Sequence, residues 1–170
     1  MSEHPLVQLA RKAIETYVSE NKVIDIPEEM SAEMKEKAGV FVSLHKQGEL
    51  RGCIGTFQPT TENVAKEVIR NAIEASSRDP RFPPVKAEEI PDLEISVDVL
   101  TDPVAVKSAK ELDAKKYGVI VKAGPRRGLL LPDLPGVNTP QEQIAICRRK
   151  AWIGEDEPVE LFRFEVRRYH

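Results

Sequence analysis

The residues of this chain that are best suited to chemistry lie in one short stretch, Leu50–Phe57 (LRGCIGTF), where a thiol stands between two glycines. Arg51 precedes Cys53 by two residues, and if its side chain points the same way, its guanidinium lowers the thiol pKa and favours a nucleophilic thiolate. Gly52 and Gly55 carry no side chain, so a ligand or another chain segment can approach Cys53 closely. The alternative is that Cys53 is a small core residue with an inert thiol.

A second candidate cluster follows in the segment 78–84 (RDPRFPP), where prolines stiffen the chain around Phe82. Such a loop can present Arg81 to a carboxylate or phosphate, because a guanidinium matches both groups with two parallel hydrogen bonds. The alternative is that Asp79 caps the local backbone and pairs with a neighbouring arginine.

The third candidate group lies on a predicted strand, residues 93–100 (LEISVDVL), in which apolar and polar residues alternate. Glu94, Ser96 and Asp98 share the face that points away from the core, so two carboxylates flank one hydroxyl. Glu94 and Ser96 are therefore candidate ligand-binding residues. A solvated sheet face explains the same pattern without any ligand.

The stretch that contains Cys53 is predicted to be the second arm of a β-hairpin. Residues 40–44 alternate, residues 46–49 (KQGE) form the turn, and residues 50–56 return as the partner strand. If His45 faces Leu50, counting along both arms places Val42 opposite Cys53 and Ser43 opposite Gly52. A bulge at the glycines would change this register.

Three long helices and a short segment complete the prediction. Apolar spacing predicts a helix over 5–20 and a second helix from an N-cap at Thr60 to about Ser77. A third helix is predicted from Thr139 onward, where TPQE forms a capping box. Cys147 falls on the apolar face of the last helix. Residues 31–37 form either a short helix or a loop. Further strands are expected at 118–122, 128–131 and 159–167. The irregular order of helices and strands predicts an α+β fold with a mainly antiparallel sheet flanked by helices.

Composition argues against several classes of protein. The 170 residues fit one domain, or one domain with a smaller lobe. A net charge of −3 and 5% aromatic residues argue against nucleic acid binding. No apolar run is long enough to cross a membrane and no signal peptide is recognisable, so we expect a cytoplasmic protein. Two distant cysteines and three histidines predict no metal site, and no motif calls for a cofactor.

The LRGCIGT stretch resembles the signature of the AMMECR domain family. Further segments resemble blocks of this family and occur in the same order. They are DPRFPPV at 79–85, EISVDVL at 94–100, GLLLP at 128–132 and CRRKA at 147–151. The resemblance extends from about residue 5 to residue 166. The chain departs from the family pattern at Tyr117, where histidine is frequent, and at Trp152, where glycine is frequent.

The resemblance implies an α+β fold in two unequal lobes with the signature near a cleft. We expect a single domain over 1–170, with a smaller lobe from segments around 20–40 and 103–140. Stand-alone members of the family, to which this chain is similar, belong to AmmeMemoRadiSam systems, which implies a MEMO-type protein and a radical-SAM enzyme as partners. The resemblance supplies no reaction, so whether the protein is an enzyme stays open.

Two hypotheses follow for the function. In the first, the chain is an accessory or substrate-presenting component that binds a small anionic ligand or a peptide beside Cys53, with Arg51 and Arg81 holding the anion. Cys53 then either forms a transient covalent bond or lines the site. In the second, the chain is a non-catalytic interaction module that receives a partner's strand or terminus, and Cys53 is structural. Regulatory RNA binding is a third, weaker alternative.

Overall fold

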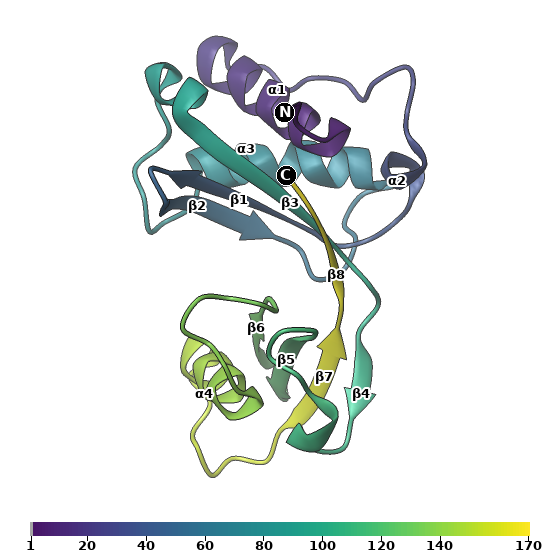
Figure 1. Cartoon of the computed structure of the whole chain (residues 1–170), viewed down its shortest axis with the longest axis vertical. Helices are drawn as coiled ribbons and strands as arrows, with labels where there is room; N and C mark the ends of the chain where they lie inside the picture. Colours follow the sequence, from purple (N-terminus) through teal and green to yellow (C-terminus); the bar gives the residue numbers. More distant parts are fainter. Residues whose placement is uncertain (1) are drawn as a thin grey trace. The chain divides into compact units, whose positions relative to one another are not determined.

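The structure is a computed structural model that describes residues 2–170. The chain forms two compact units, one made of residues up to Leu100 together with Arg167–His170, and the other of Thr101–Val166. Each has its own sheet and its own apolar core. The segment 103–140 belongs to the second unit, whereas residues 20–40 belong to the first (Figure 1).

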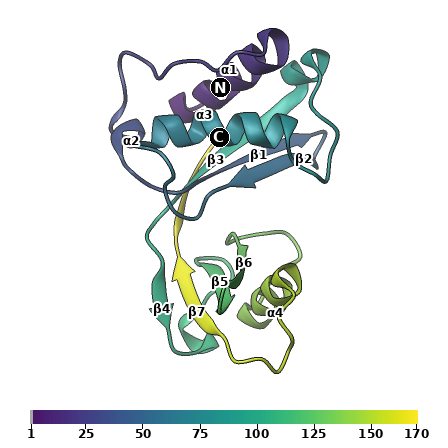
Figure 2. The same cartoon turned by 180° about the vertical axis from the view of Figure 1, so that it is seen from behind.

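The first unit contains a sheet with the strand order β2-β1-β3-β8. Its elements are α1 (Pro5–Glu20), α2 (Ala32–Lys35), β1 (Val40–Lys46), β2 (Glu49–Gly55), α3 (Val64–Ser77), the 3₁₀ helix η1 (Ala87–Asp92), β3 (Leu93–Leu100) and β8 (Val166–Tyr169). Both β2 and β3 run antiparallel to β1. The two long helices pack on one side of this sheet (Figure 1 and Figure 2).

The core of the first unit lies between this sheet and the two helices. Val42, Leu44 and Val97 are fully buried there, together with Leu6 of α1 and Val68 of α3. These are the apolar positions of the predicted helix stripes and strand alternations, which place every second strand residue on the same face. The predicted helix over 5–20 and the strand over 93–100 are confirmed.

The second unit contains a sheet with the order β4-β7-β5-β6. Its elements are β4 (Val104–Val106), η2 (Ala109–Glu111), β5 (Gly118–Ala123), β6 (Arg126–Leu130), α4 (Pro140–Ala151) and β7 (Glu160–Phe164). The predicted capping box starts α4, because the Glu142 amide donates to Thr139 Oγ1 at 3.1 Å. Cys147 is fully buried, as predicted.

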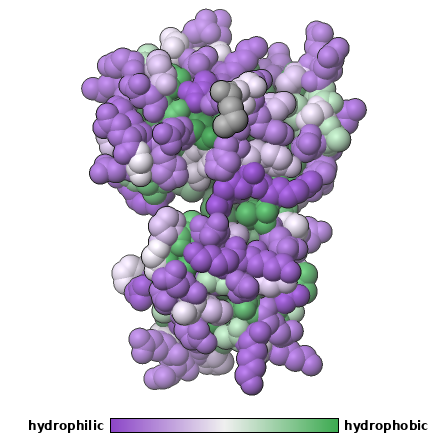
Figure 3. All heavy atoms as spheres, viewed as in Figure 1, coloured by the Kyte–Doolittle hydropathy of each residue, from purple (hydrophilic) through white to green (hydrophobic). Residues whose placement is uncertain are grey.

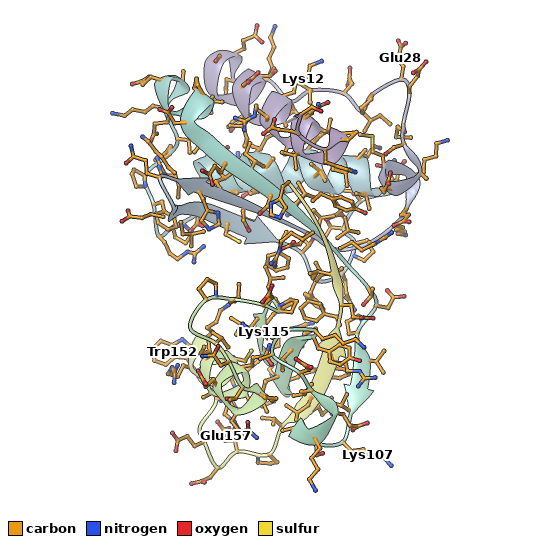
Figure 4. All side chains as sticks on the ribbon, in the orientation of Figure 1. Lys12, Glu28, Lys107, Lys115, Trp152 and Glu157 are labelled. Atoms are coloured by element: carbon orange, nitrogen blue, oxygen red, sulfur yellow. The ribbon has the colours of Figure 1, made fainter. Side chains whose placement is uncertain are left out.

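The helix α4 is capped at its C-terminal end by Trp152, which has a left-handed backbone with φ of 59°. This conformation favours glycine, the residue frequent in the resembled family at this position. The Trp152 side chain points outward and the residue is 88% exposed (Figure 4). At the other departure from the family pattern, the Arg163 guanidinium lies 4.4 Å from the centre of the Tyr117 ring.

The predicted α+β class with antiparallel strands is confirmed, but one predicted strand is divided between the two sheets. The strand predicted over 159–167 is two strands, of which β7 joins the second sheet and β8 joins the first. The strand β4 was not predicted, because a three-residue strand is too short to show a period of two.

The start of α3 was predicted three residues too early. The helix is capped by Asn63, whose side chain accepts from the Lys66 amide, and not by Thr60. The Thr60 and Thr61 amides instead donate to the carboxylate of Glu67, which is fully buried on α3. A buried carboxylate requires hydrogen-bond donors, and this loop supplies them.

The face of the molecule in Figure 3 is predominantly hydrophilic, with small apolar areas scattered over it. This agrees with the 31% of charged residues in the sequence. Within residues 2–170, no helix has the length and apolar character needed to cross a membrane.

Candidate functional site

The hairpin of β1 and β2 contains a bulge that changes the predicted register. His45 does face Leu50, but Leu44 faces Gly52 and Ser43 faces Cys53. The extra residue on β2 is Arg51, so every pairing beyond it is shifted by one position relative to the simple count. The predicted pairing of Val42 with Cys53 is therefore wrong.

The register aligns three small polar residues across three strands. Cys53 of β2 faces Ser43 of β1, which in turn faces Ser96 of β3. The Sγ atom of Cys53 lies 3.4 Å from the Oγ atom of Ser43. We call the sheet side that carries this row, opposite α1 and α3, the polar face. It comprises Phe41, Ser43, His45, Cys53, Gly55, Glu94, Ser96 and Asp98.

The two glycines of the signature are required by contacts within the chain. A Cβ atom on Gly52 would lie 2.4 Å from the carbonyl oxygen of Ala75, because α3 packs directly on β2 at this point. A Cβ atom on Gly55 would lie 2.2 Å from the ring of Phe41. The sequence left open whether a ligand or another chain segment lies against the glycines. At both positions it is another segment of the chain.

The loop after α3 is clamped to the edge strand at Cys53. The Cys53 amide donates to Asp79 Oδ2 at 3.0 Å, and Arg81 Nη2 donates to the Cys53 carbonyl at 3.1 Å. Arg81 also donates to Asp79 through Nε at 3.0 Å and through Nη2 at 2.8 Å. Asp79 is buried, and the Arg81 side chain is 55% exposed. These contacts agree with the alternative stated for this cluster, in which Asp79 caps the local backbone and pairs with a neighbouring arginine.

Arg51 is held in a second clamp. Its Nε and Nη2 atoms donate to the two carboxylate oxygens of Glu89, both at 3.1 Å, and Nη1 donates to the Pro83 carbonyl at 2.8 Å. Lys46 also contacts Glu89, at 3.3 Å. Each arginine of the predicted anion site thus has a carboxylate partner within its own chain.

The thiol of Cys53 is not activated by Arg51, which points to Glu89. Burial raises the pKa of the Cys53 thiol above its ordinary value, and the opposing effects of the Ser43 hydroxyl and the Arg81 guanidinium are smaller. The condition for a thiol pKa lowered by Arg51, a guanidinium that points toward Cys53, is therefore not met. Within residues 2–170, Ser43 is the side chain that hydrogen-bonds the thiol, and a hydroxyl is too weak a base to form a thiolate at neutral pH.

The remaining predicted residues lie around this row. Phe82 is half-buried, with the Arg81 guanidinium 5.3 Å from its ring centre. Glu94 is exposed and faces His45 across the sheet. Asp98 was expected on a solvated face but is only 1% exposed, because Arg168 binds its carboxylate with a contact of 2.7 Å.

Two acids that shape this region were not predicted from the sequence, Glu67, which is fully buried, and Glu89, which is partly buried. Glu67 accepts from the loop before α3, and Glu89 accepts from Arg51 and from the Lys86 amide. Neither has a sequence signal, since Glu67 is bound by hydroxyls and amides of the preceding loop and Arg51 lies 38 residues before Glu89. No cluster of three histidine, cysteine or acidic residues within residues 2–170 has the arrangement of a metal site.

The stability of the fold at low pH tests the contacts that Arg81 and Arg51 make with Asp79 and Glu89. The Arg81 side chain lowers the pKa of Asp79 to about 2, and the Arg51 side chain does the same for Glu89. A carboxyl whose pKa is lower in the folded state stabilises the fold above its unfolded pKa and loses that contribution as the pH falls. Asp79 should thus contribute about 2 kcal/mol that disappears between about pH 4 and pH 2.

Urea denaturation between pH 7 and pH 2 measures this contribution. Asp79→Asn should be less stable than the wild type at pH 7, and the two curves should converge toward pH 2. Glu62→Gln is the matched control, because Glu62 is 80% exposed in its pair with Lys66. A constant difference between Asp79→Asn and the wild type at every pH would contradict the clamp.

The chain resembles known proteins over nearly its whole length. The profile of the AMMECR1 family matches residues 7–169. A protein of Thermotoga maritima is 52% identical over 172 residues, covering 99% of both chains. A Clostridium acetobutylicum protein is 50% identical over 167 residues, which cover 97% of this chain and 36% of that protein. The crystal structure of an uncharacterized Pyrococcus horikoshii protein superposes with a TM-score of 0.88 at 36% identity, over 96% of this chain and 88% of that one.

Proposed function

Because the chain belongs to the AMMECR1 family, we propose that it is a non-catalytic binding component of a MEMO-type and radical-SAM modification pathway. In this proposal, the polar face around Cys53 binds a peptide or a small anionic ligand and presents it to the pathway enzymes. The pathway rests on the family resemblance. The role of the polar face rests on the contacts of its residues.

The observation that carries a binding role is the state of Cys53 and its neighbours. The thiol contacts a hydroxyl, its pKa is raised by burial, and both nearby arginines are paired with carboxylates. A nucleophilic cysteine needs a base or an unopposed cation to form its thiolate. These contacts favour a thiol that lines a surface over one that attacks a substrate.

The geometry favours a peptide over a small dianion as the ligand. Arg51 uses all three of its nitrogens within the chain, whereas within residues 2–170 the Nη1 atom of Arg81 forms no hydrogen bond and its side chain is half exposed. The polar face adds the hydroxyl of Ser96 and the carboxylate of Glu94. The ligand would therefore meet one available guanidinium edge, hydroxyls and a carboxylate. This set suits a ligand that carries both positive and negative charges, as a peptide does.

Strand addition to β2 at Cys53 is disfavoured. A partner strand would have to pair with the amide and carbonyl that point away from β1, but Asp79 and Arg81 already bind both groups of Cys53. The proposed ligand therefore contacts the side chains of the polar face.

Alkylation kinetics test the non-catalytic role. Iodoacetamide should modify Cys53 slowly at pH 7 and faster as the pH rises above about 8.5, the ordinary thiol value. Cys147 is an internal control, since burial raises its pKa to about 12 and the residue is fully buried, so it should react only after unfolding. Rapid, pH-independent modification of Cys53 near pH 6 would show a preformed thiolate and refute the proposal.

Binding to the pathway proteins tests the presenting role. The purified chain should co-purify with a MEMO-type protein or a radical-SAM enzyme from the same organism, and Glu94→Lys on the polar face should reduce that binding. Glu15→Lys is the matched control, because Glu15 is exposed on α1, on the opposite side of the sheet. Absence of binding to both partners, or equal loss with both variants, would contradict the proposal.

A further inference from the structure

A groove separate from the polar face lies in the helix layer of the first unit. It has a volume of about 570 Å³, within the range of cavities that bind small ligands and peptide side chains. It is lined on one wall by Ile69 and Ile73 of α3, which are only 4% and 5% exposed, and on the other by Ile24 and Ile26 from the connection between α1 and α2, which pack against the same core. The groove is lined mainly by apolar side chains of these two segments.

The connection that forms the second wall has an unusual feature. Residues 22–27 lie outside helices and strands, and within residues 2–170 their backbone and side chains form no hydrogen bond. Val23, at the groove, is 64% exposed. An exposed apolar side chain beside unpaired backbone donors and acceptors is a site at which another chain can pair.

The wall formed by α3 carries an excess of positive charge. Lys66, Arg70, Glu74 and Arg78 line it at intervals of four residues, which places them along one side of the helix. Glu74 is paired with Arg78, and Lys66 with Glu62 outside the groove. Arg70 has no carboxylate partner among the described residues, and its Nη1 atom donates to the Asn71 side chain. The opposite wall contributes one carboxylate, Asp25.

We propose that this groove binds an extended peptide segment of a partner protein, in which apolar residues alternate with acidic residues. The peptide backbone pairs with residues 22–26, its apolar side chains pack against Val23, Ile24 and Tyr17 at the groove, and its carboxylates face Arg70. Alternation with a period of two directs the apolar and acidic side chains to these two different environments.

A peptide accounts for more of the observations than a small amphiphile does. A small amphiphile would use the apolar side chains and one cation, but it would form no hydrogen bonds with the exposed backbone of residues 22–26. A peptide that binds as an added strand forms hydrogen bonds along that backbone. Pockets for its alternate side chains then give the specificity.

The test uses a defined pair of probes, EVEIEVE-amide with fluorescein on its N-terminal amine and the same labelled peptide with lysine in place of glutamate. The acidic peptide should bind at least about ten times more tightly, as measured by fluorescence anisotropy at low salt. Binding should also slow hydrogen exchange at residues 22–26. Arg70→Glu should weaken binding of the acidic peptide by about tenfold.

Lys12→Glu is the matched control, because it makes the same charge change at an exposed position of α1 that does not line the groove (Figure 4). It should change the affinity less than about twofold. Equal binding of the two peptides, equal effects of the two variants, or binding without protection of residues 22–26 would each overturn the inference. None of these outcomes involves the polar face, so the proposed function is tested separately.

Discussion

Replacement of Arg168 by methionine is expected to destabilise the first unit by about 3–5 kcal/mol at pH 7. The Asp98 side chain is 2% exposed, and Arg168 binds its two oxygens at 2.7 and 3.3 Å. Methionine keeps much of the apolar volume of the arginine stem but leaves a buried carboxylate without its cation. Removing one partner of a buried ion pair costs far more than the pair itself contributes. Urea denaturation of the variant measures the loss.

Arg167→Met is the matched control for this prediction. Arg167 pairs with Glu36, but both side chains are at least 40% exposed, so the same substitution one residue earlier should cost at most about 1 kcal/mol. Burial raises the pKa of Asp98 and Arg168 opposes that rise. Without Arg168, the variant should regain stability as the pH falls and Asp98 takes up a proton. Equal losses for the two methionine variants would refute the role of the buried pair.

Gly52→Ala is expected to destabilise the first unit by about 2–3 kcal/mol, although it adds a single methyl group. The new Cβ would lie 2.4 Å from the Ala75 carbonyl oxygen, a distance that requires α3 to move away from β2. A displaced helix loses its contacts with both β1 and β2, where the core is fully packed. Thermal denaturation gives the loss, and hydrogen exchange should show weaker protection in α3 and β1.

Gly154→Ala is the control for this substitution. Its Cβ would lie 3.4 Å from the flexible Glu157 side chain, so the change should be nearly neutral. Gly128→Ala should reproduce the large effect in the second unit, since its Cβ would lie 2.1 Å from the Cys147 carbonyl oxygen. If Gly52→Ala is as stable as Gly154→Ala, the close packing of α3 on β2 is not what requires glycine in the signature.

Features with local causes could be predicted from the sequence. The helix over 5–20 follows from apolar spacing within sixteen residues, and the start of α4 follows from the four-residue motif TPQE. The alternation in residues 93–100 likewise determined which residues of β3 face the core. Where a group outside the local motif competes with that motif, the prediction was wrong, as at Thr60, which donates to Glu67 and leaves the N-cap to Asn63.

The sequence by itself determined that Arg51, Gly52, Cys53 and Gly55 lie on the second arm of a hairpin, because that follows from the spacing of residues along the chain. The tertiary structure alone decided what these residues contact. One bulged residue shifts Cys53 from Val42 to Ser43, and packing of α3 accounts for Gly52. Arg51 binds Glu89, which is 38 residues away, since a guanidinium pairs with whichever carboxylate the fold brings within reach. Such partners depend on how the chain folds back on itself, and no local pattern of residues encodes them.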